Sequence, residues 1–446
     1  MAHTIGIRRE DLDKKGEQRV AISPEIAAEI HRNGAKLLIQ PGIHPDTREN
    51  KRAFPDQAYE EEGATVAEDL SPSDIIVGLK EVKKTDLIPE KTYLFFSHTH
   101  KGQIKNRSLL KALIEKKNTL IDYELVTDPQ NRRLITAFTY FAGYAGMTDS
   151  LWTYGKRMGA SHPFHQVPQA IDSGGMQAVK SLMREIGQQI EAEGTPADLP
   201  PFICCFLGAG KTSTGSQEIF DLLPVESITL DQLVHTYEHG DRKKVYKLVL
   251  DIPQMYRFKE DSSYKGKEMT DQEVFSLYLK EPENFESNLD QVFPYVSMVL
   301  NCIIWSSQYP RLLSREDTKA WYAQHKTLQV IGDITCDPEG AIHFSKETWI
   351  DNPVYIYDPA SKESIDGFEG EGIAVMAVTN LPCEFPADAS TQFSKELAPL
   401  FTKLLEADLS ADDIAEAGLP PALRKATILW KGKFTEPYAY MEEYVK

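Results

Sequence analysis

The chain has 446 residues and a formal charge of −18, with 67 acidic against 49 basic side chains. Nucleic acids and anionic membranes attract basic patches, so this balance argues against either as a partner. A chain of this length is expected to form two or three domains. Its amino terminus lacks the pattern of a signal peptide, and no apolar run reaches the roughly 20 residues of a membrane helix.

Five cysteines are present, and none has CxxC spacing. Cys204 and Cys205 lie in an apolar segment and are expected to pack in a core. Reduced thiols are typical of cytoplasmic proteins, so we expect a cytoplasmic location. No Cys/His cluster is present, so no metal site is predicted.

The first part of the chain alternates strand and helix patterns. Strands are expected at residues 3–8, 35–40, 74–80, 93–98 and 119–124, with helices from Pro24 to Gly34, at 56–62 and at 107–117. This alternation predicts an α/β fold with a mostly parallel sheet.

Three ionisable residues end consecutive strands of this sheet. Lys80, His98 and Glu124 close the strands at 74–80, 93–98 and 119–124. Ligands of such sheets bind beyond the carboxyl ends of the strands. One such residue could be a solvated strand end, but three in succession predict a functional site.

The second part of the chain is expected to form another α/β unit. Helices are predicted at 141–158, 173–192 and 289–308, strands at 327–335, 354–357 and 373–378, and a charged, irregular insertion at about 231–290. A helix that starts near Ser390 and runs to about Ala407 is expected to return to the first unit. The predicted domains are therefore residues 1–138 with 386–446, and residues 139–385.

A glycine turn carries the clearest binding signal. An apolar strand enters Gly208-Ala209-Gly210 and a helix-like segment leaves it, as in a dinucleotide site, where the helix start offers N–H groups to a pyrophosphate. The lysine and threonine that follow suggest an ATP-binding P-loop, but that loop requires a glycine where Cys205 stands. A third glycine comes late, at Gly215, and such a turn can also be only a turn.

The choice of nicotinamide cofactor depends on the next strand, expected at residues 227–230. In a dinucleotide fold an acidic residue at the end of the second strand, about 20 residues past the first glycine, holds the ribose of NAD. This segment ends at Leu230 without an acid before Asp231. The pattern favours NADP(H), with NAD(H) left open.

The motifs together resemble a known family. Ile5-Gly6-Ile7-Arg8-Arg9-Glu10 and Glu17-x-Arg19-Val20-Ala21 resemble the entrance of alanine dehydrogenases, transhydrogenase nucleotide subunits and saccharopine dehydrogenases. A further set is most similar to the lysine-ketoglutarate reductase half of aminoadipic semialdehyde synthases: Gly78-Leu79-Lys80-Glu81, Phe95-Phe96-Ser97-His98, Leu120-Ile121-Asp122-Tyr123-Glu124, Ala142-Gly143-Tyr144-Ala145-Gly146-Met147, Pro310-Arg311-Leu312-Leu313, Asp333-Ile334-Thr335-Cys336-Asp337 and Asn380-Leu381-Pro382.

The resemblance implies two Rossmann-like domains with a cleft between them, and NADPH-dependent condensation of L-lysine with 2-oxoglutarate to saccharopine. It implies that Lys80 and His98 act as the acid/base pair. Arg19 and Arg133 suit the carboxylates of 2-oxoglutarate, while Glu124 and Asp333 suit the lysine ammonium or tune the acid/base pair. The expected cofactor-binding residues are Gly208, Ala209, Gly210, Thr229, Asn380 and Leu381.

Two other functions share parts of this pattern. An alanine-dehydrogenase-like enzyme would aminate pyruvate with ammonia on NAD, and a transhydrogenase-like subunit would bind nucleotide without catalysis. The expected partners are small-molecule substrates only, with a homo-oligomer left open. The chain ends at Lys446 without a second dehydrogenase, so we expect another protein to carry out any second step.

Overall fold

The computed structural model describes residues 3–446, which divide into two compact units. Unit 1 combines residues up to Phe138 with Pro386–Lys446, and unit 2 is Thr139–Phe385. In the described part of the chain, no helix is both long and apolar enough to span a membrane.

Unit 1 is built on an eight-stranded sheet in the order β18-β17-β6-β5-β4-β1-β2-β3. The strands β1 to β6 are parallel to one another, whereas β17 pairs antiparallel with both β6 and β18. Their bounds are β1 Thr4–Ile7, β2 Lys36–Ile39, β3 Thr65–Val66, β4 Ile75–Val77, β5 Thr92–Phe95, β6 Thr119–Asp122, β17 Thr427–Trp430 and β18 Lys433–Phe434. The predicted parallel sheet is confirmed.

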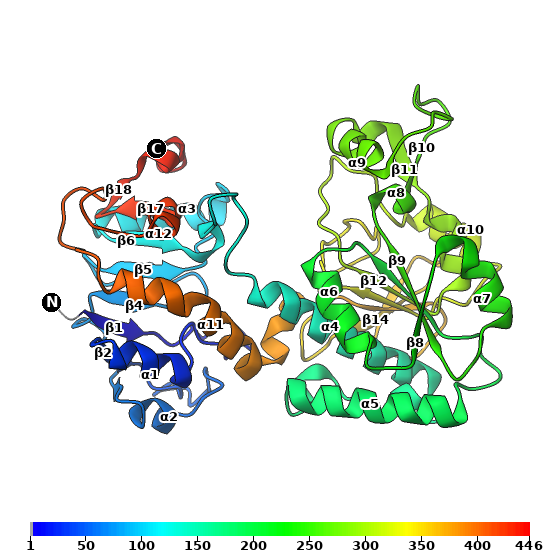
Figure 1. Cartoon of the computed structure of the whole chain (residues 1–446), viewed down its shortest axis with the longest axis horizontal. Helices are drawn as coiled ribbons and strands as arrows, with labels where there is room; N and C mark the ends of the chain where they lie inside the picture. Colours follow the sequence, from blue (N-terminus) through cyan, green and yellow to red (C-terminus); the bar gives the residue numbers. More distant parts are fainter. Residues whose placement is uncertain (1–2) are drawn as a thin grey trace. The chain divides into compact units, whose positions relative to one another are not determined.

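Helices from both ends of the chain cover this sheet. Unit 1 contains α1 Pro24–Arg32, α2 Asp56–Glu60, α3 Ile104–Glu115, α11 Pro386–Leu404 and α12 Pro421–Ala426, with short 3-10 turns at Tyr123–Leu125 and Glu436–Tyr444. Figure 1 shows α11, in orange, running alongside α1, in blue, and the two helices are in contact. Phe393 and Leu397 of α11 share one apolar core with Ile26 and Ile30 of α1, which explains why the distant segment belongs to this unit.

Unit 2 contains a second eight-stranded sheet in the order β15-β14-β16-β13-β12-β7-β9-β8. The strands β8, β9, β7, β12, β13 and β16 pair in parallel, whereas β14 pairs antiparallel with both β16 and β15. The bounds are β7 Ile203–Leu207, β8 Val225–Ile228, β9 Val245–Leu250, β12 Met298–Asn301, β13 Val330–Asp333, β14 Val354–Tyr357, β15 Ser364–Asp366 and β16 Ile373–Met376. The predicted α/β class with two mostly parallel sheets is therefore confirmed.

The helices of unit 2 pack closely where glycines allow it. They are α4 Ala137–Met158, which begins in unit 1, α5 Met176–Glu193, α6 Lys211–Phe220, α7 Leu233–His239, α8 Ile252–Met255, α9 Asp271–Lys280 and α10 Arg315–Tyr322. A Cβ on Gly143 of α4 would lie 2.1 Å from the carbonyl oxygen of Thr212, and one on Gly215 would lie 2.4 Å from that of Tyr140. Gly215 thus brings α6 against α4.

Three sequence predictions in unit 2 are wrong. The supposed irregular insertion at 231–290 contains β9, which pairs with both β7 and β8. A charged run at 241–244 precedes this strand and hid its apolar pattern. Residues 251–290 lie outside the large sheet and include an antiparallel pair, β10 Tyr256–Phe258 and β11 Phe285–Ser287.

The helix predicted at 289–308 is instead two short 3-10 turns followed by β12. A short run that is apolar on both faces does not distinguish a buried strand from a buried helix. The strand predicted at 227–230 is β8, but it is the edge strand: β9, and not β8, lies next to β7.

Candidate active site

The loop after β4 carries Lys80 and Glu81 at the carboxyl edge of the unit 1 sheet. Lys80 is partly buried and lies three residues beyond Val77, the last residue of β4. Its neighbour Glu81 accepts hydrogen bonds from two side chains: His98 Nδ1 at 2.6 Å and Lys14 Nζ at 3.1 Å from its oxygens. The loop therefore links Lys80 to His98.

His98 follows β5 in a conformation that few residues adopt. Its φ of 50° lies in the left-handed region, and its ring stacks on Phe96 at 6.4 Å between centroids. Burial alone would raise the pKa of Glu81, but the hydrogen bond and charge of His98 hold that pKa well below its usual range. The carboxylate thus keeps a charge that orients the imidazole.

Arg19 forms an ion pair with Glu17. Its Nε and Nη2 donate to the two oxygens of Glu17 at 2.8 and 2.6 Å, and its guanidinium lies 4.3 Å from the ring centroid of Phe138. Both charged side chains are at most 2 % exposed. Burial would raise the pKa of Glu17, yet Arg19 and Lys80 lower it to about 2. Arg19 is thus part of a buried ion pair.

Glu124 joins a second group of charges after β6. Its Oε1 accepts from Lys101 Nζ at 2.8 Å and from Arg133 Nη2 at 2.9 Å, and its Oε2 lies 3.6 Å from His100 Nε2. Burial opposes ionisation, but Lys101 and Arg133 hold the pKa of Glu124 below its usual range. Arg133 is 58 % exposed, which makes it the accessible cation of the group.

Sequence reasoning missed several residues that the fold brings to this edge. Glu17, Glu81, His100 and Lys101 are charged or titratable and contact the predicted residues. Burial lowers the pKa of His100, although Asp122 and Glu124 oppose the shift. Their positions in the sequence could have indicated them, because each of these four residues lies within three residues of a predicted site residue.

Asp333 lies in unit 2, at the end of β13, and its carboxylate is already well bonded. Asn301 Nδ2 donates to Oδ1 at 2.8 Å, Thr335 Oγ1 donates to the same oxygen at 3.2 Å, and Ser345 Oγ donates to Oδ2. Burial raises the pKa of Asp333 against these hydrogen bonds. The carboxylate orients the loop that follows β13.

The glycine turn has the geometry that a dinucleotide needs. Gly208 has a φ of 98°, donates its N–H to Leu250 at 2.8 Å, and would place a Cβ 2.8 Å from Ile303. Ala209 and Gly210 are exposed, and a Cβ on Gly210 would meet no described atom within 4 Å. The first N–H groups of α6 lack partners within their helix, as in any α-helix, and can receive a pyrophosphate here.

The other expected cofactor residues lie at ends of elements in the same unit. Thr229 follows β8 and caps a 3-10 turn with Gln232. Asn380 donates to Cys383 Sγ, and Leu381 is buried against Gly146. Thr229 is therefore at the edge of the sheet, and β9 lies between its strand and β7.

Asp251 follows β9, the strand beside β7, and was not predicted as a site residue from the sequence.

Family models match both units of the chain. The alanine dehydrogenase/PNT N-terminal domain matches residues 6–145, and the alanine dehydrogenase/PNT C-terminal domain matches residues 259–437. The chain belongs to the alanine dehydrogenase/PNT family. Membership places it among the NAD(P)-dependent oxidoreductases, in agreement with the glycine turn of unit 2.

Curated relatives narrow the similarity within the alanine dehydrogenase/PNT family. An alpha-aminoadipic semialdehyde synthase of Arabidopsis thaliana is 31 % identical over 98 % of this chain and 41 % of its own length. The mitochondrial one of Rattus norvegicus is 31 % identical over 98 % of this chain and 47 % of its own. The chain thus spans less than half of the length of these relatives. The predicted resemblance to aminoadipic semialdehyde synthases is confirmed.

A second kind of relative has nearly the length of this chain. A saccharopine dehydrogenase [NAD(+), L-lysine-forming] of Neurospora crassa is 24 % identical over 86 % of this chain and 87 % of its own. Among solved structures, an L-alanine dehydrogenase has a TM-score of 0.62 at 17 % identity, covering 99 % of this chain and 98 % of that one. A transhydrogenase from Sinorhizobium meliloti has a TM-score of 0.57 at 16 % identity, covering 97 % and 100 %. These structures agree on the fold.

Proposed function

We propose that the protein condenses L-lysine with 2-oxoglutarate reductively to saccharopine and catalyses the reverse reaction. The observation that carries this proposal is the grouping of Lys80 with the Glu81–His98 pair, whose atoms lie 2.6 Å apart, at the carboxyl edge of the unit 1 sheet. The similarity to aminoadipic semialdehyde synthases and saccharopine dehydrogenases supports it.

The reaction needs several proton transfers. The ε-amine of lysine attacks the ketone, water leaves the carbinolamine, and the imine is reduced; each step benefits from a group with a pKa near the working pH. A bound nicotinamide cofactor supplies the hydride. We assign the proton transfers to Lys80 Nζ and His98 Nε2, because Glu81 bonds the other ring nitrogen and so sets the orientation of the imidazole.

In this proposal, charged side chains bind the two substrates. Arg133 is assigned to a carboxylate of 2-oxoglutarate because it is exposed and uses one N–H for Glu124. Arg19 is assigned to the same substrate as a second cation. This cation is buried and also forms an ion pair with Glu17. Glu124 is assigned to the lysine ammonium, and Asp333 to orienting the end of β13.

The cofactor assignment differs from the one that sequence reasoning favoured. That reasoning used residues 227–230, which form the edge of the sheet. The strand beside β7 is β9, and the acidic Asp251 follows it directly, where a ribose hydroxyl is bound in this fold. The segment Asp251–Gln254 contains no Arg or Lys for a 2′-phosphate. We therefore propose NAD(H), held by Gly208, Ala209, Gly210 and Asp251.

A coupled assay tests both assignments. NADH and NADPH oxidation are measured with 2-oxoglutarate and a panel of amines that includes L-lysine, and with pyruvate and ammonia. Oxidation that requires lysine and 2-oxoglutarate together supports the proposal, whereas turnover of pyruvate with ammonia alone contradicts it. Asp251→Ser is expected to lower the NADH/NADPH ratio of kcat/KM by about tenfold, since about 1.4 kcal/mol of ribose binding is lost. An unchanged ratio would remove Asp251 from the cofactor site.

A cytoplasmic location and a homo-oligomeric state stay predictions from the sequence. The five cysteines are all buried, as expected of thiols that pack in a core.

A further inference from the structure

Two acidic side chains from the segment after β1 bond the backbone of the loop that carries Lys80. Glu10 accepts the N–H of Leu79 on Oε1 at 2.8 Å and the N–H of Lys80 on Oε2 at 3.0 Å. Asp11 accepts the N–H of Lys83 on Oδ2 at 3.2 Å. Three backbone groups within five residues of the loop are therefore held by two carboxylates.

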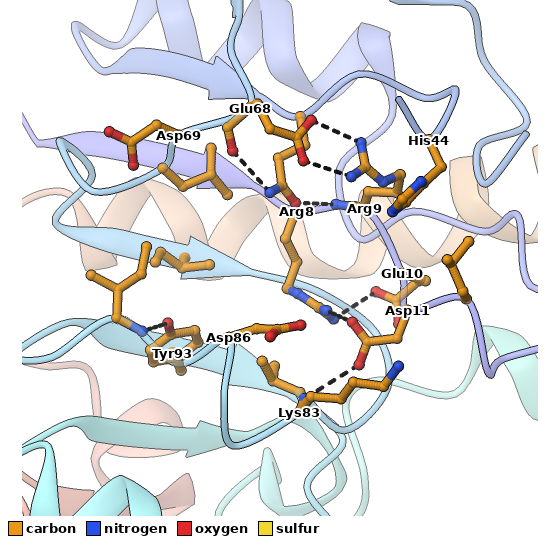
Figure 2. Close-up of a pocket in the computed structure, with 16 residues that line it drawn as sticks. Arg8, Arg9, Glu10, Asp11, His44, Glu68, Asp69, Lys83, Asp86 and Tyr93 are labelled. Atoms are coloured by element: carbon orange, nitrogen blue, oxygen red, sulfur yellow. Dashed lines mark hydrogen bonds and ion pairs between the residues drawn. The ribbon is translucent and has the colours of Figure 1, made fainter. Parts of the chain in front are cut away.

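Arg8 compensates the charge of these carboxylates. Figure 2 shows its guanidinium directed toward Glu10 and Asp11 in the wall of a pocket of about 340 Å³. Arg8 Nη1 lies 3.7 Å from Glu10 Oε1, and Nη2 bonds Asp11 Oδ1. The three side chains are at most 7 % exposed, so these charges interact with little screening by water. We call Arg8, Glu10 and Asp11 the clamp.

The loop approaches the clamp so closely that a side chain would not fit. A Cβ on Gly78 would lie 2.9 Å from Arg8 Cδ and 3.2 Å from Glu10 Oε1. The φ of Gly78 is not in the left-handed region. A glycine is therefore required at this position by the close contact and not by the backbone conformation.

Both groups of the proposed acid/base pair depend on this loop. Lys80 is one of its residues, and its amide bonds Glu10 directly. His98 lies on another strand, but its ring is bonded at 2.6 Å by Glu81 of the same loop. A displacement of the loop therefore moves both groups, and displacements of about 1 Å at reacting groups cost roughly 10²-fold in rate.

We propose that Glu10, held by Arg8, is a positioning residue for Lys80 and His98. The inference rests on the proposed function only for the roles of those two side chains. A carboxylate is required because each oxygen accepts one N–H from the loop. In Glu10→Gln one oxygen becomes an NH₂ group, which faces an N–H donor and cannot accept it.

Two variants and one control test the clamp. Glu10→Gln removes one of the two acceptors, and Gly78→Ala pushes the loop off the clamp without changing any charge. Glu68→Gln is the control, because Glu68 lines the same pocket and bonds Arg9 at 2.7 Å. We measure kcat, the KM for cofactor, the pH profile of kcat/KM, and amide hydrogen exchange of Leu79 and Lys80 in the full chain.

Both clamp variants are expected to lower kcat about tenfold or more, to shift the pH profile, and to leave the KM for cofactor within about twofold. In Glu10→Gln the two amides should exchange at least about tenfold faster, while Glu68→Gln matches the wild type. If Glu10→Gln does not fold, Gly78→Ala decides alone by the same measurements.

Wild-type kcat in both variants, or wild-type exchange of Leu79 and Lys80 in Glu10→Gln, would overturn the clamp. Absence of turnover by the wild type with lysine and 2-oxoglutarate would overturn the proposed function instead. In that event amide exchange still decides the clamp, because it needs no substrate.

Discussion

At the scale of single residues, three carboxylates of the unit 1 site are each bonded to basic side chains. Glu17 is bonded by Arg19, Glu81 by His98 and Lys14, and Glu124 by Lys101 and Arg133. Buried charges are tolerated only with partners, so removing one member leaves the other without compensation. This pairing allows several ionised groups to lie at one sheet edge.

Replacing Lys80 by Met or His98 by Gln should lower kcat by roughly 10²-fold or more, the usual contribution of a general acid or base. The cofactor affinity should stay within about twofold, since its expected residues lie in unit 2. Steady-state kinetics and cofactor titration check both points. Wild-type turnover by the two variants would show that the reaction takes place elsewhere.

Arg19→Lys tests whether the buried ion pair also binds substrate. Lysine offers a point charge and cannot bond both oxygens of Glu17 in parallel. If Arg19 serves the oxo acid, the KM for 2-oxoglutarate rises about tenfold or more, beyond any change in the KM for lysine or cofactor. A lower melting temperature with unchanged KM values would instead assign Arg19 to stability alone.

At the scale of elements, two acidic side chains join α4 to the 3-10 turn Leu381–Glu384 in unit 2. Asp149 Oδ1 accepts the N–H of Ala170 at 2.7 Å, and Glu384 Oε2 accepts that of Ile171 at 3.2 Å. The remaining oxygens, Asp149 Oδ2 and Glu384 Oε1, are buried without a hydrogen-bond donor among the described residues. We expect the two carboxyls to share one proton, which would satisfy both oxygens.

This pair makes stability depend on pH. Burial raises the pKa of both carboxyls, that of Asp149 from 3.8 to about 6. A raised folded pKa means that the bound proton stabilises the fold fully below about pH 4, and that this stability is lost as the pH rises through about 6. In Glu384→Gln the side-chain amide is a neutral donor at all pH values. Over this pH range, the unfolding free energy of the variant should therefore fall by on the order of 2 kcal/mol less than that of the wild type.

Denaturant unfolding of the full chain between about pH 5 and pH 7.5 measures this difference. Glu185→Gln, an exposed change on α5, is the matched control and should follow the wild type. Parallel curves for the wild type and Glu384→Gln would exclude a shared proton.

At the scale of the whole molecule, unit 1 is closed by the last 61 residues of the chain, Pro386–Lys446. Ser390 Oγ accepts the N–H of Val20 at 2.9 Å, and Ser394 Oγ accepts that of Ser23 at 2.6 Å, so α11 holds the segment that follows Arg19. Glu396 accepts the N–H groups of Thr136 and Ala137 at the start of α4.

Deleting residues 386–446 should therefore unfold unit 1. The deletion uncovers the apolar core around α1 and removes β17, the strand beside β6. We expect rapid proteolysis of residues 3–138 and loss of the proposed reaction. Survival of residues 3–138 under limited proteolysis would show that α11 and β17 are dispensable for this unit.

Local features of the fold could be predicted from the amino-acid sequence. The strand–turn–helix at Gly208 follows from residues adjacent in the chain. The order of β4, β5 and β6 was also predictable, but these strands end at Val77, Phe95 and Asp122. Lys80, His98 and Glu124 therefore lie in the segments that follow and do not end the strands. Ordered motifs along the chain also sufficed to indicate the family, because each motif is a short run of consecutive residues.

The contacts between segments far apart in the chain became visible in the folded structure alone. Parallel pairing joins strands far apart in the chain, so β9 replaced β8 beside β7, and Asp251 became the acidic residue at that position. Glu10 reached the Lys80 loop for the same reason, since β1 and β4 are neighbours although about 70 residues separate them. Hydrogen bonds of this kind depend on strand order, which local propensity does not encode.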